Sequence, residues 1–171
     1  LSINNNKLHL LPGNLYNLPN LKGLTFNNNK ITNISNDIWK LQNLIEINCS
    51  NNKISKLPES IGKLTKLQRL DISNNKLFKL PNSIATLSKL EYLDISRNQI
   101  THLPKTICLL NLNLYFNSLI AGNNYICDNI PECIENFAGF NYEYQNTGIP
   151  KYVSQNCSSC DDGYIEVKKK Y

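Results

Sequence analysis

The cysteines are the residues of this 171-residue chain whose type and spacing could most readily do chemistry. Four of the six lie in the last third of the sequence, at Cys127, Cys133, Cys157 and Cys160. Cys157 and Cys160 have the C-x-x-C spacing of zinc ligands, but Cys127 and Cys133 do not match a common first zinc knuckle. Three interpretations of these four cysteines stay open: reduced structural thiols, disulfides and, as a weak candidate, a four-thiolate zinc site.

No other group of residues in the sequence has the pattern of a catalytic site. The sequence contains no glycine-rich phosphate loop, no H-E-x-x-H motif and no nucleophile elbow. A redox or nucleophilic role for Cys157 and Cys160 lacks both a βαβ context and a nearby histidine in the sequence. We therefore predict no catalytic residues, no cofactor and no enzymatic activity.

Composition and charge exclude several classes of protein. Hydrophobic residues make up 41% of the chain, enough for a core, and no run approaches the ~18 apolar residues of a membrane span. Residues 1–110 contain 14 Lys and Arg against six Asp and Glu, whereas residues 111–171 contain four against seven. The cations are not clustered with aromatic residues, as they are in a nucleic-acid footprint. We predict neither a nucleic-acid partner nor insertion into a membrane.

A repeat with a regular period indicates the elements that must position any site. Apolar residues and one asparagine recur in the same slots of four to five copies, and one copy holds Leu70, Ile72, Asn75, Leu77 and Leu80. A step of 23 along the chain leads to the next copy, which holds Leu93, Ile95, Asn98, Ile100 and Leu103. Cys49 occupies the slot of Ile72, so we predict that it is a small buried hydrophobic residue. Repetition at such a period is typical of a solenoid.

Each copy is predicted to form one short strand followed by a turn. Side chains alternate along a strand, so Leu70 and Ile72 point to one side and Asp71 to the other. Stacking the copies buries the apolar side and gives a parallel sheet over a continuous core. The asparagine after each strand can bond to backbone groups that the turn leaves unpaired. We predict a buried structural ladder of these asparagines, formed by Asn6, Asn29, Asn52, Asn75, Asn98 and Asn123.

The segment after each asparagine is predicted to return over the opposite face. Leu80-Pro81 fixes an extended start, and the three-residue spacing of Ile84 and Leu87 suits a short helix or 3-10 turn. A hydroxyl side chain precedes the isoleucine of this turn in several copies. We expect it to help satisfy free backbone donors at Ser60, Ser83 and Thr106.

These slots resemble the leucine-rich repeat family, whose pattern is L-x-x-L-x-L-x-x-N-x-L. The trailing L-P-x-x-I resembles the 23-residue subclass that is common in intracellular repeat proteins associated with Ras signalling. The resemblance covers residues 1–109 and continues more loosely to about residue 150. It implies an α/β solenoid, a right-handed superhelix with a parallel sheet on its concave face and short helices or 3-10 turns on its convex face.

The resemblance also implies a function. Repeats of this family present a concave surface to a protein partner, so we expect a non-catalytic protein–protein interaction module, favoured to be intracellular, with a partner of unknown identity. One alternative is an extracellular adhesion or receptor ectodomain whose cap is stapled by disulfides. Another is the recruiting arm of a larger enzyme whose catalytic domain is absent from this chain.

The regular spacing is predicted to end near the C-terminus. A step of 23 from Asn98 reaches Ala121, whereas a step of 25 reaches Asn123, which fits the asparagine slot of a lengthened copy. We expect leucine-rich repeats over residues 1–133, a degenerate capping repeat over 134–160 and a tail over 161–171. Because Leu1 falls inside a copy, we also expect that upstream repeats are missing.

On the predicted concave face, small polar residues form a uniform background. The departures from it gather on adjacent strands and include the tyrosine and arginine types that are favoured at binding hot spots. The candidate protein-binding residues are Glu46, Arg69, Asp71, Tyr92, Asp94 and Arg97. Just past the asparagine turn, a basic line is formed by Lys7, Lys30, Lys53 and Lys76.

Overall fold

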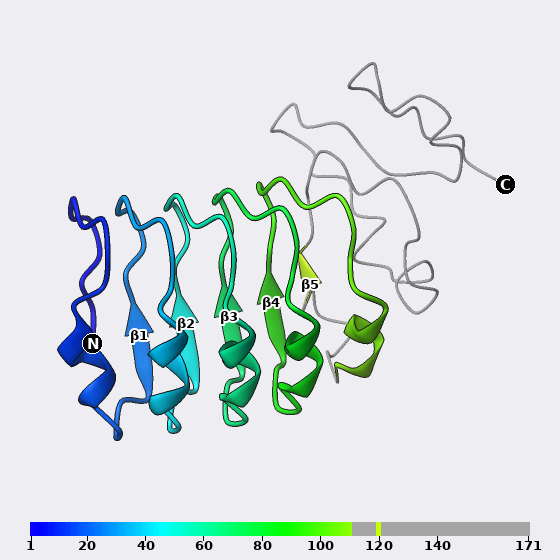
Figure 1. Ribbon diagram of the computed structural model, residues 1–171, viewed down its shortest axis with the longest axis horizontal. Helices are drawn as coiled ribbons and strands as arrows, with labels where there is room; N and C mark the ends of the chain where they lie inside the picture. Colours follow the sequence, from blue (N-terminus) through cyan, green and yellow to red (C-terminus); the bar gives the residue numbers. More distant parts are fainter. Residues whose placement is uncertain (111–118, 121–171) are drawn as a thin grey trace, which may run out of the picture.

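The computed structural model describes residues 1–110 and 119–120 of the chain. In this part the chain winds in successive coils, with short strands along one side and 3-10 turns along the other (Figure 1). The strands are β1 (Gly23–Thr25), β2 (Glu46–Asn48), β3 (Arg69–Asp71), β4 (Tyr92–Asp94) and β5 (Leu119–Ile120). The 3-10 turns are η1 (Gly13–Asn17), η2 (Asn36–Lys40), η3 (Glu59–Lys63), η4 (Asn82–Thr86) and η5 (Lys105–Leu109).

The strands form one parallel sheet in chain order, β1-β2-β3-β4-β5. From β1 to β4, equivalent residues of successive copies lie opposite one another, as Leu24 does to Ile47 and Leu70 to Leu93. The middle residue of each of these strands is buried and its two neighbours are more exposed. The parallel sheet and the alternation of buried and exposed residues, both predicted from the repeat, are therefore confirmed.

Proline and isoleucine shape the convex side as the sequence predicts. Pro81 has φ −68° and ψ 148°, so the chain enters η4 from an extended conformation. The backbone N–H of Leu87 then donates to the carbonyl oxygen of Ile84, which closes the turn with Ile84 buried. Such bonds between residues three apart define a 3-10 turn, which is why apolar residues recur here at a spacing of three.

The expected role of the hydroxyl groups in this turn is wrong at all three positions. The buried Oγ atom of Ser60 has no hydrogen-bond partner among the described residues, and that of Ser83 accepts from no backbone donor there. Thr106 Oγ1 donates to the carbonyl oxygen of Asn82, one coil back, instead of accepting from a backbone donor. The proline before each of these turns removes one N–H that would otherwise need an acceptor, so a hydroxyl cap has less to satisfy.

One glycine allows two convex turns to pack closely. Thr86 Oγ1 donates to the carbonyl oxygens of Gly62 (2.6 Å) and Ser83 (2.8 Å), and so joins η4 to η3. A Cβ atom at Gly62 would collide with the Ser83 carbonyl and the Thr86 hydroxyl. This coil therefore depends on a residue without a side chain at its convex surface.

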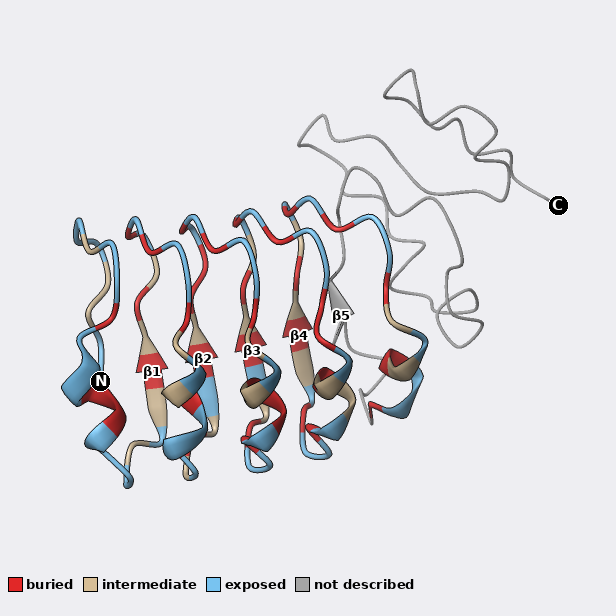
Figure 2. Ribbon diagram, viewed as in Figure 1, coloured by how far each residue is buried: buried red, intermediate tan, exposed pale blue. Residues whose placement is uncertain are grey.

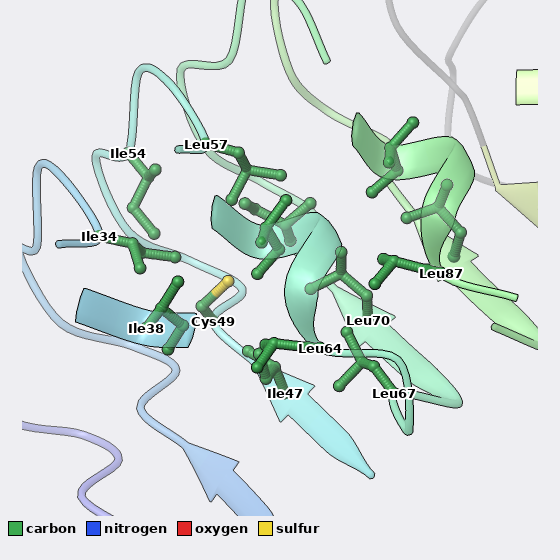
Figure 3. Close-up of a cluster of buried hydrophobic side chains, with 14 of the residues drawn as sticks. Ile34, Ile38, Ile47, Cys49, Ile54, Leu57, Leu64, Leu67, Leu70 and Leu87 are labelled. Atoms are coloured by element: carbon green, nitrogen blue, oxygen red, sulfur yellow. The ribbon is translucent and has the colours of Figure 1, made fainter. Parts of the chain in front are cut away.

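A single apolar core runs through the coils between the sheet and the 3-10 turns. Buried and exposed residues alternate in the same way from coil to coil (Figure 2). Leu70, Leu64 and Ile38 come from different elements and meet in this core, and all are at most 1% exposed (Figure 3). Cys49 lies among them with no exposed surface, and burial raises the pKa of its thiol well above the usual value. The prediction that Cys49 acts as a buried hydrophobic residue is confirmed.

The side-chain amide of Asn75 joins two coils. Its Nδ2 donates to the carbonyl oxygens of Ile72 and Ser73 in its own coil, at 3.1 Å each. The same nitrogen donates to the carbonyl oxygen of Cys49, one coil back, at 3.0 Å. Its Oδ1 accepts from the backbone N–H of Ile54 at 2.9 Å. One side chain therefore satisfies backbone groups on both sides of a coil boundary.

This arrangement repeats along the predicted ladder. Buried asparagines that bond across a coil boundary are Asn29, Asn52, Asn75 and Asn98. Asn6 differs: it is exposed and donates within its own coil, to Ile3 and Asn4. It differs because the described chain has no coil before it to bond with or to cover it. Asn123 lies outside the described residues.

A second column of asparagines was not predicted. The residues with positive φ among those described are Asn5, Asn28, Asn51, Asn74 and Arg97, with φ between 51° and 57°. Asparagine tolerates this left-handed conformation better than most residues with a side chain. The amides also bond to one another: Asn28 Nδ2 donates to Asn5 Oδ1 at 2.8 Å, and Asn74 Nδ2 donates to Asn51 Oδ1. Backbone geometry thus explains part of the asparagine content.

The regular spacing changes at the last described strand. Leu119 in β5 lies opposite Leu93 in β4, 26 positions earlier in the chain. Equivalent residues of the preceding strands are 23 positions apart, so this copy is longer, as predicted. Its length exceeds the predicted step of 25 by one position. Cys108, on η5, is disulfide-bonded. The predicted repeat boundary at residue 133, the capping repeat over 134–160 and the tail over 161–171 lie outside the described residues.

Replacing Asn75 by alanine should lower the free energy of unfolding by about 1–3 kcal/mol, because the Ile54 N–H and several carbonyl groups would lose their partner in a buried site. Denaturant unfolding followed by circular dichroism measures this change. Asn82→Ala is the matched control, since Asn82 is exposed and its side chain makes no hydrogen bond to the described residues. An equal midpoint for Asn75→Ala and Asn82→Ala would contradict the structural role of the ladder.

Candidate binding surface on the concave sheet face

The parallel register arranges five of the six candidate residues in two rows. Glu46, Arg69 and Tyr92 lie opposite one another at the start of β2, β3 and β4. Asp71 and Asp94 lie opposite one another at the end of β3 and β4. All five are at flanking strand positions, where side chains point away from the core. The structure thus brings these residues together on the concave face.

Arg69 is at the centre of the first row. Its guanidinium carbon lies 4.2 Å from the centre of the Tyr92 ring, which is a cation–π contact. On its other side, Arg69 Nε lies 4.0 Å from Glu46 Oε1. Both charged side chains of that pair are about half exposed (55% and 48%), so the ion pair contributes little to stability. The stacked tyrosine therefore orients the guanidinium more than the carboxylate does.

Serines orient the two carboxylates of the second row. Asp71 Oδ1 accepts from the backbone N–H (3.0 Å) and the hydroxyl (2.7 Å) of Ser73. Asp94 Oδ1 accepts from the backbone N–H of Ser96 at 2.9 Å, and the Tyr92 hydroxyl lies 3.4 Å from Asp94 Oδ2. Ser73 and Ser96 belong to the small polar residues that were expected to form a uniform background on this face. In fact they fix the direction of the aspartates beside them.

Burial and nearby negative charge raise the pKa values of one side chain in each row, Tyr92 and Asp94. Desolvation, reinforced by the nearby Asp94 and Asp71 carboxylates, raises the pKa of Tyr92 to about 12. Desolvation also raises the pKa of Asp94; bonds from Ser96 oppose this and the Asp71 charge adds to it. In the described part of the chain, neither aspartate forms a salt bridge. The row thus presents negative charge that no cation neutralises.

Arg97 lies apart from these rows. It occupies the left-handed position of the turn after β4, with φ 53°, where the equivalent residues of the other coils are asparagines. A long side chain is less favourable than asparagine in this conformation. Arg97 is exposed, and it lies past the end of β4, outside the two rows.

The described residues contain no other arrangement that suggests chemistry. No group of three or more His, Cys, Asp or Glu side chains that could hold a metal ion is found within residues 1–110 and 119–120. The weak zinc candidates and disulfide candidates Cys127, Cys133, Cys157 and Cys160 lie outside that part. Over the same part, the helices are all too short and too polar to cross a membrane.

Comparison with known proteins decides the family. The family model described as "Leucine Rich repeats (2 copies)" matches residues 42–84, and one described as "Leucine rich repeat" matches residues 65–119. The chain is a leucine-rich repeat protein. Leucine-rich repeat domains are generally non-catalytic and bind proteins. The sheet of stacked coils described above is the solenoid expected of this family.

Solved leucine-rich repeat structures are similar to this chain. A Leptospira interrogans protein is 42% identical over 58% of this chain and 26% of its own, with a TM-score of 0.58. An internalin from Listeria monocytogenes is 30% identical over 73% of this chain and 34% of its own, with a TM-score of 0.60. The ectodomain of the Arabidopsis thaliana receptor kinase GASSHO1/SCHENGEN3 is 26% identical over 72% of this chain and 15% of its own, with a TM-score of 0.60.

The leucine-rich repeat chain spans only about a third or less of the length of these structures. A search of curated proteins gave no match. The comparisons therefore establish the repeat and its fold.

Asp94→Asn should raise the free energy of unfolding at neutral pH. The pKa of folded Asp94 lies above the unfolded value near 3.8, so protonated Asp94 favours the folded state. This contribution to the free energy of unfolding is complete below pH 3.8 and is lost as the pH rises through the folded pKa. Asparagine carries no charge and can still accept from Ser96. We expect Asp94→Asn to exceed the wild type in urea midpoint at pH 7 and to match it at pH 3, with Glu91→Gln as an exposed control. A gap that is the same at both pH values would contradict the electrostatic explanation.

Proposed function

We propose that this leucine-rich repeat protein is a non-catalytic module that binds an extended segment of a partner protein on the concave face of β2–β4. One observation carries the proposal: the stacked Arg69–Tyr92 pair lies beside the Asp71–Asp94 pair on adjacent strands. Arginine and tyrosine are enriched among residues whose truncation costs most binding energy. Both are displayed here by backbone that is fixed on either side by sheet hydrogen bonds.

Rigid display is the proposed mechanism. A partner that docks on a fixed sheet leaves little of this chain to be ordered, so less of the contact energy is lost as entropy. The Tyr92 ring offers apolar area together with a hydroxyl, and the unpaired carboxylates of Asp71 and Asp94 match a cation on the partner. The Arabidopsis relative, solved in complex with CASPARIAN STRIP INTEGRITY FACTOR 2, supports the idea that such a fold holds a partner.

The double variant Arg69→Ala/Tyr92→Ala tests the binding surface. Peptides selected from a random displayed library on the immobilised wild-type chain should bind the variant at least about tenfold more weakly, because a central anchor pair is removed. The melting temperature should fall by no more than a few degrees, since both side chains flank the core without belonging to it.

The convex face provides a matched control for this experiment. Lys63 Nζ lies 5.3 Å from the centre of the Trp39 ring, so Trp39→Ala/Lys63→Ala removes a cation–aromatic pair from the other side of the solenoid. The selected peptides should bind this control as they bind the wild type. Peptides that lose affinity for the convex variant and keep it for the concave one would place the binding surface elsewhere.

A second proposal concerns location. The disulfide of Cys108 supports the extracellular adhesion or receptor alternative over the intracellular one, because disulfides persist in oxidising compartments and are rare in the cytosol. The receptor ectodomain among the similar structures supports the same alternative.

Counting free thiols tests this location. Under denaturing, non-reducing conditions, protein isolated from its native source should contain two or fewer free thiols of the six cysteines in the sequence, one of them Cys49. Cys49 should react only after unfolding, because it is fully buried. Six free thiols would instead support the intracellular alternative.

A further inference from the structure

The excess positive charge of the coils lies on a single edge of the solenoid. Between the end of each strand and the next 3-10 turn, the chain crosses this edge in segments that run side by side (Figure 1). The segments are residues 5–12, 28–35, 51–58, 74–81 and 97–104. They contain seven of the 14 Lys and Arg of residues 1–110 and none of the six Asp and Glu. The other seven cations are nearly balanced by those six acids.

We name this the basic edge. Its lysines recur at equivalent positions of successive coils. The cations of the edge are Lys7, Lys30, Lys53, Lys56, Lys76, Lys79 and Arg97. The backbone N–H of Lys53 donates to the carbonyl oxygen of Ile31 at 2.8 Å, and that of Lys76 donates to Ile54 at 2.9 Å, so equivalent lysines follow one another from coil to coil. Neighbouring strands are about 4.8 Å apart, which sets the backbone spacing between equivalent lysines of successive coils.

In the described part of the chain no acidic side chain forms a salt bridge with the basic edge, although Glu59 lies near Lys79: bonds from Ser83 and the Lys79 charge lower the pKa of its carboxyl. All seven cationic residues are exposed, and the two salt bridges found within the described residues, Lys40–Asp37 and Arg69–Glu46, lie elsewhere. Exposed like charges on neighbouring coils repel one another weakly, because water and salt screen them. An anionic surface of similar extent would remove that repulsion.

Two exposed apolar side chains lie on the same edge. Leu10 is 64% exposed and Phe78 is 49% exposed, and Lys79 Nζ lies 5.8 Å from the centre of the Phe78 ring. Lysines beside an aromatic and an aliphatic side chain fit an interface where lipid headgroups meet acyl chains. Six of the seven cations are lysines, which act as point charges, whereas planar bidentate recognition of phosphates favours arginine.

We propose that the basic edge docks on the surface of an anionic lipid bilayer, with Phe78 and Leu10 entering the headgroup region. The contact is peripheral and electrostatic. Because the edge lies at the ends of the strands, docking there leaves the concave face of β2–β4 open to a protein partner (Figure 1). The proposal is independent of what binds that face and of the compartment, since it requires only an anionic lipid surface on the side of the membrane that the chain faces.

Co-sedimentation of the chain with lipid vesicles tests the proposal. The protein should bind vesicles that contain phosphatidylserine, should not bind vesicles of phosphatidylcholine alone, and should be released by salt.

The triple variant Lys30→Glu/Lys53→Glu/Lys76→Glu should reduce binding to the phosphatidylserine vesicles at least about tenfold. The control Lys66→Glu/Lys89→Glu/Lys105→Glu has the same net charge but changes exposed lysines outside the basic edge, and it should keep most of the binding. Equal losses in the two triple variants would overturn the role of the edge.

Phe78→Ser separates a bilayer from other polyanions. It should weaken vesicle binding and leave binding to heparin and to duplex DNA, measured at the same ionic strength, unchanged. Circular dichroism checks that each variant keeps its fold; Phe78 is half exposed and is not a core residue. If Phe78→Ser leaves vesicle binding unchanged, or if heparin or DNA binds more tightly than the vesicles, the lipid proposal is wrong and the edge is a general polyanion site.

Discussion

The fold depends on how backbone groups are satisfied where the chain leaves each strand. The turn there points N–H and C=O groups into an interior that water does not reach, and unpaired groups in such a place are costly. A primary amide can donate twice and accept, so one asparagine can bond to its own coil and to the coil before it. Because the same side chain shapes the turn and spans the coil boundary, it also fixes the distance and register between coils. The files of leucines in the core and every column of surface residues follow from that register.

The sequence was sufficient to predict what repeats. The slots of Leu70, Ile72 and Asn75 identify the buried face of a strand and the turn after it. In the structure Leu70 and Ile72 are buried and Asn75 bonds to the backbone of the turn. The proline before η1, η3, η4 and η5 was equally informative, while Ser35 takes its place before η2. Features that depend on geometry between slots were not predictable. The column of Asn51 resembles an ordinary solvated row, since nothing in the residue type alone distinguishes a left-handed backbone from a polar surface.

Other differences have similar causes. The hydroxyl of Ser60 is compatible with either a cap or an unpaired group, and the residue type does not decide between them; in the structure its Oγ has no partner among the described residues. The longer offset at β5, where Leu119 pairs with Leu93, arises in a copy whose aliphatic slots no longer fix a register. On the candidate surface, Glu46, Arg69 and Tyr92 could be selected from the sequence because their residue types differ from the small polar background of that face. The stacking of Arg69 on Tyr92 and the orientation of Asp71 by Ser73 required coordinates.

The bonds of the buried asparagines reach one coil back and no farther within the described residues, between positions 21 or 26 apart. The asparagine bonds therefore join each coil only to its immediate neighbours, and they do not depend on the total number of coils. Duplication or loss of one whole repeat unit would preserve the surroundings of nearly every surviving residue while changing the reach of the molecule by about 4.8 Å. Such an architecture lets evolution adjust the size of a recognition surface in discrete steps without redesigning its interior.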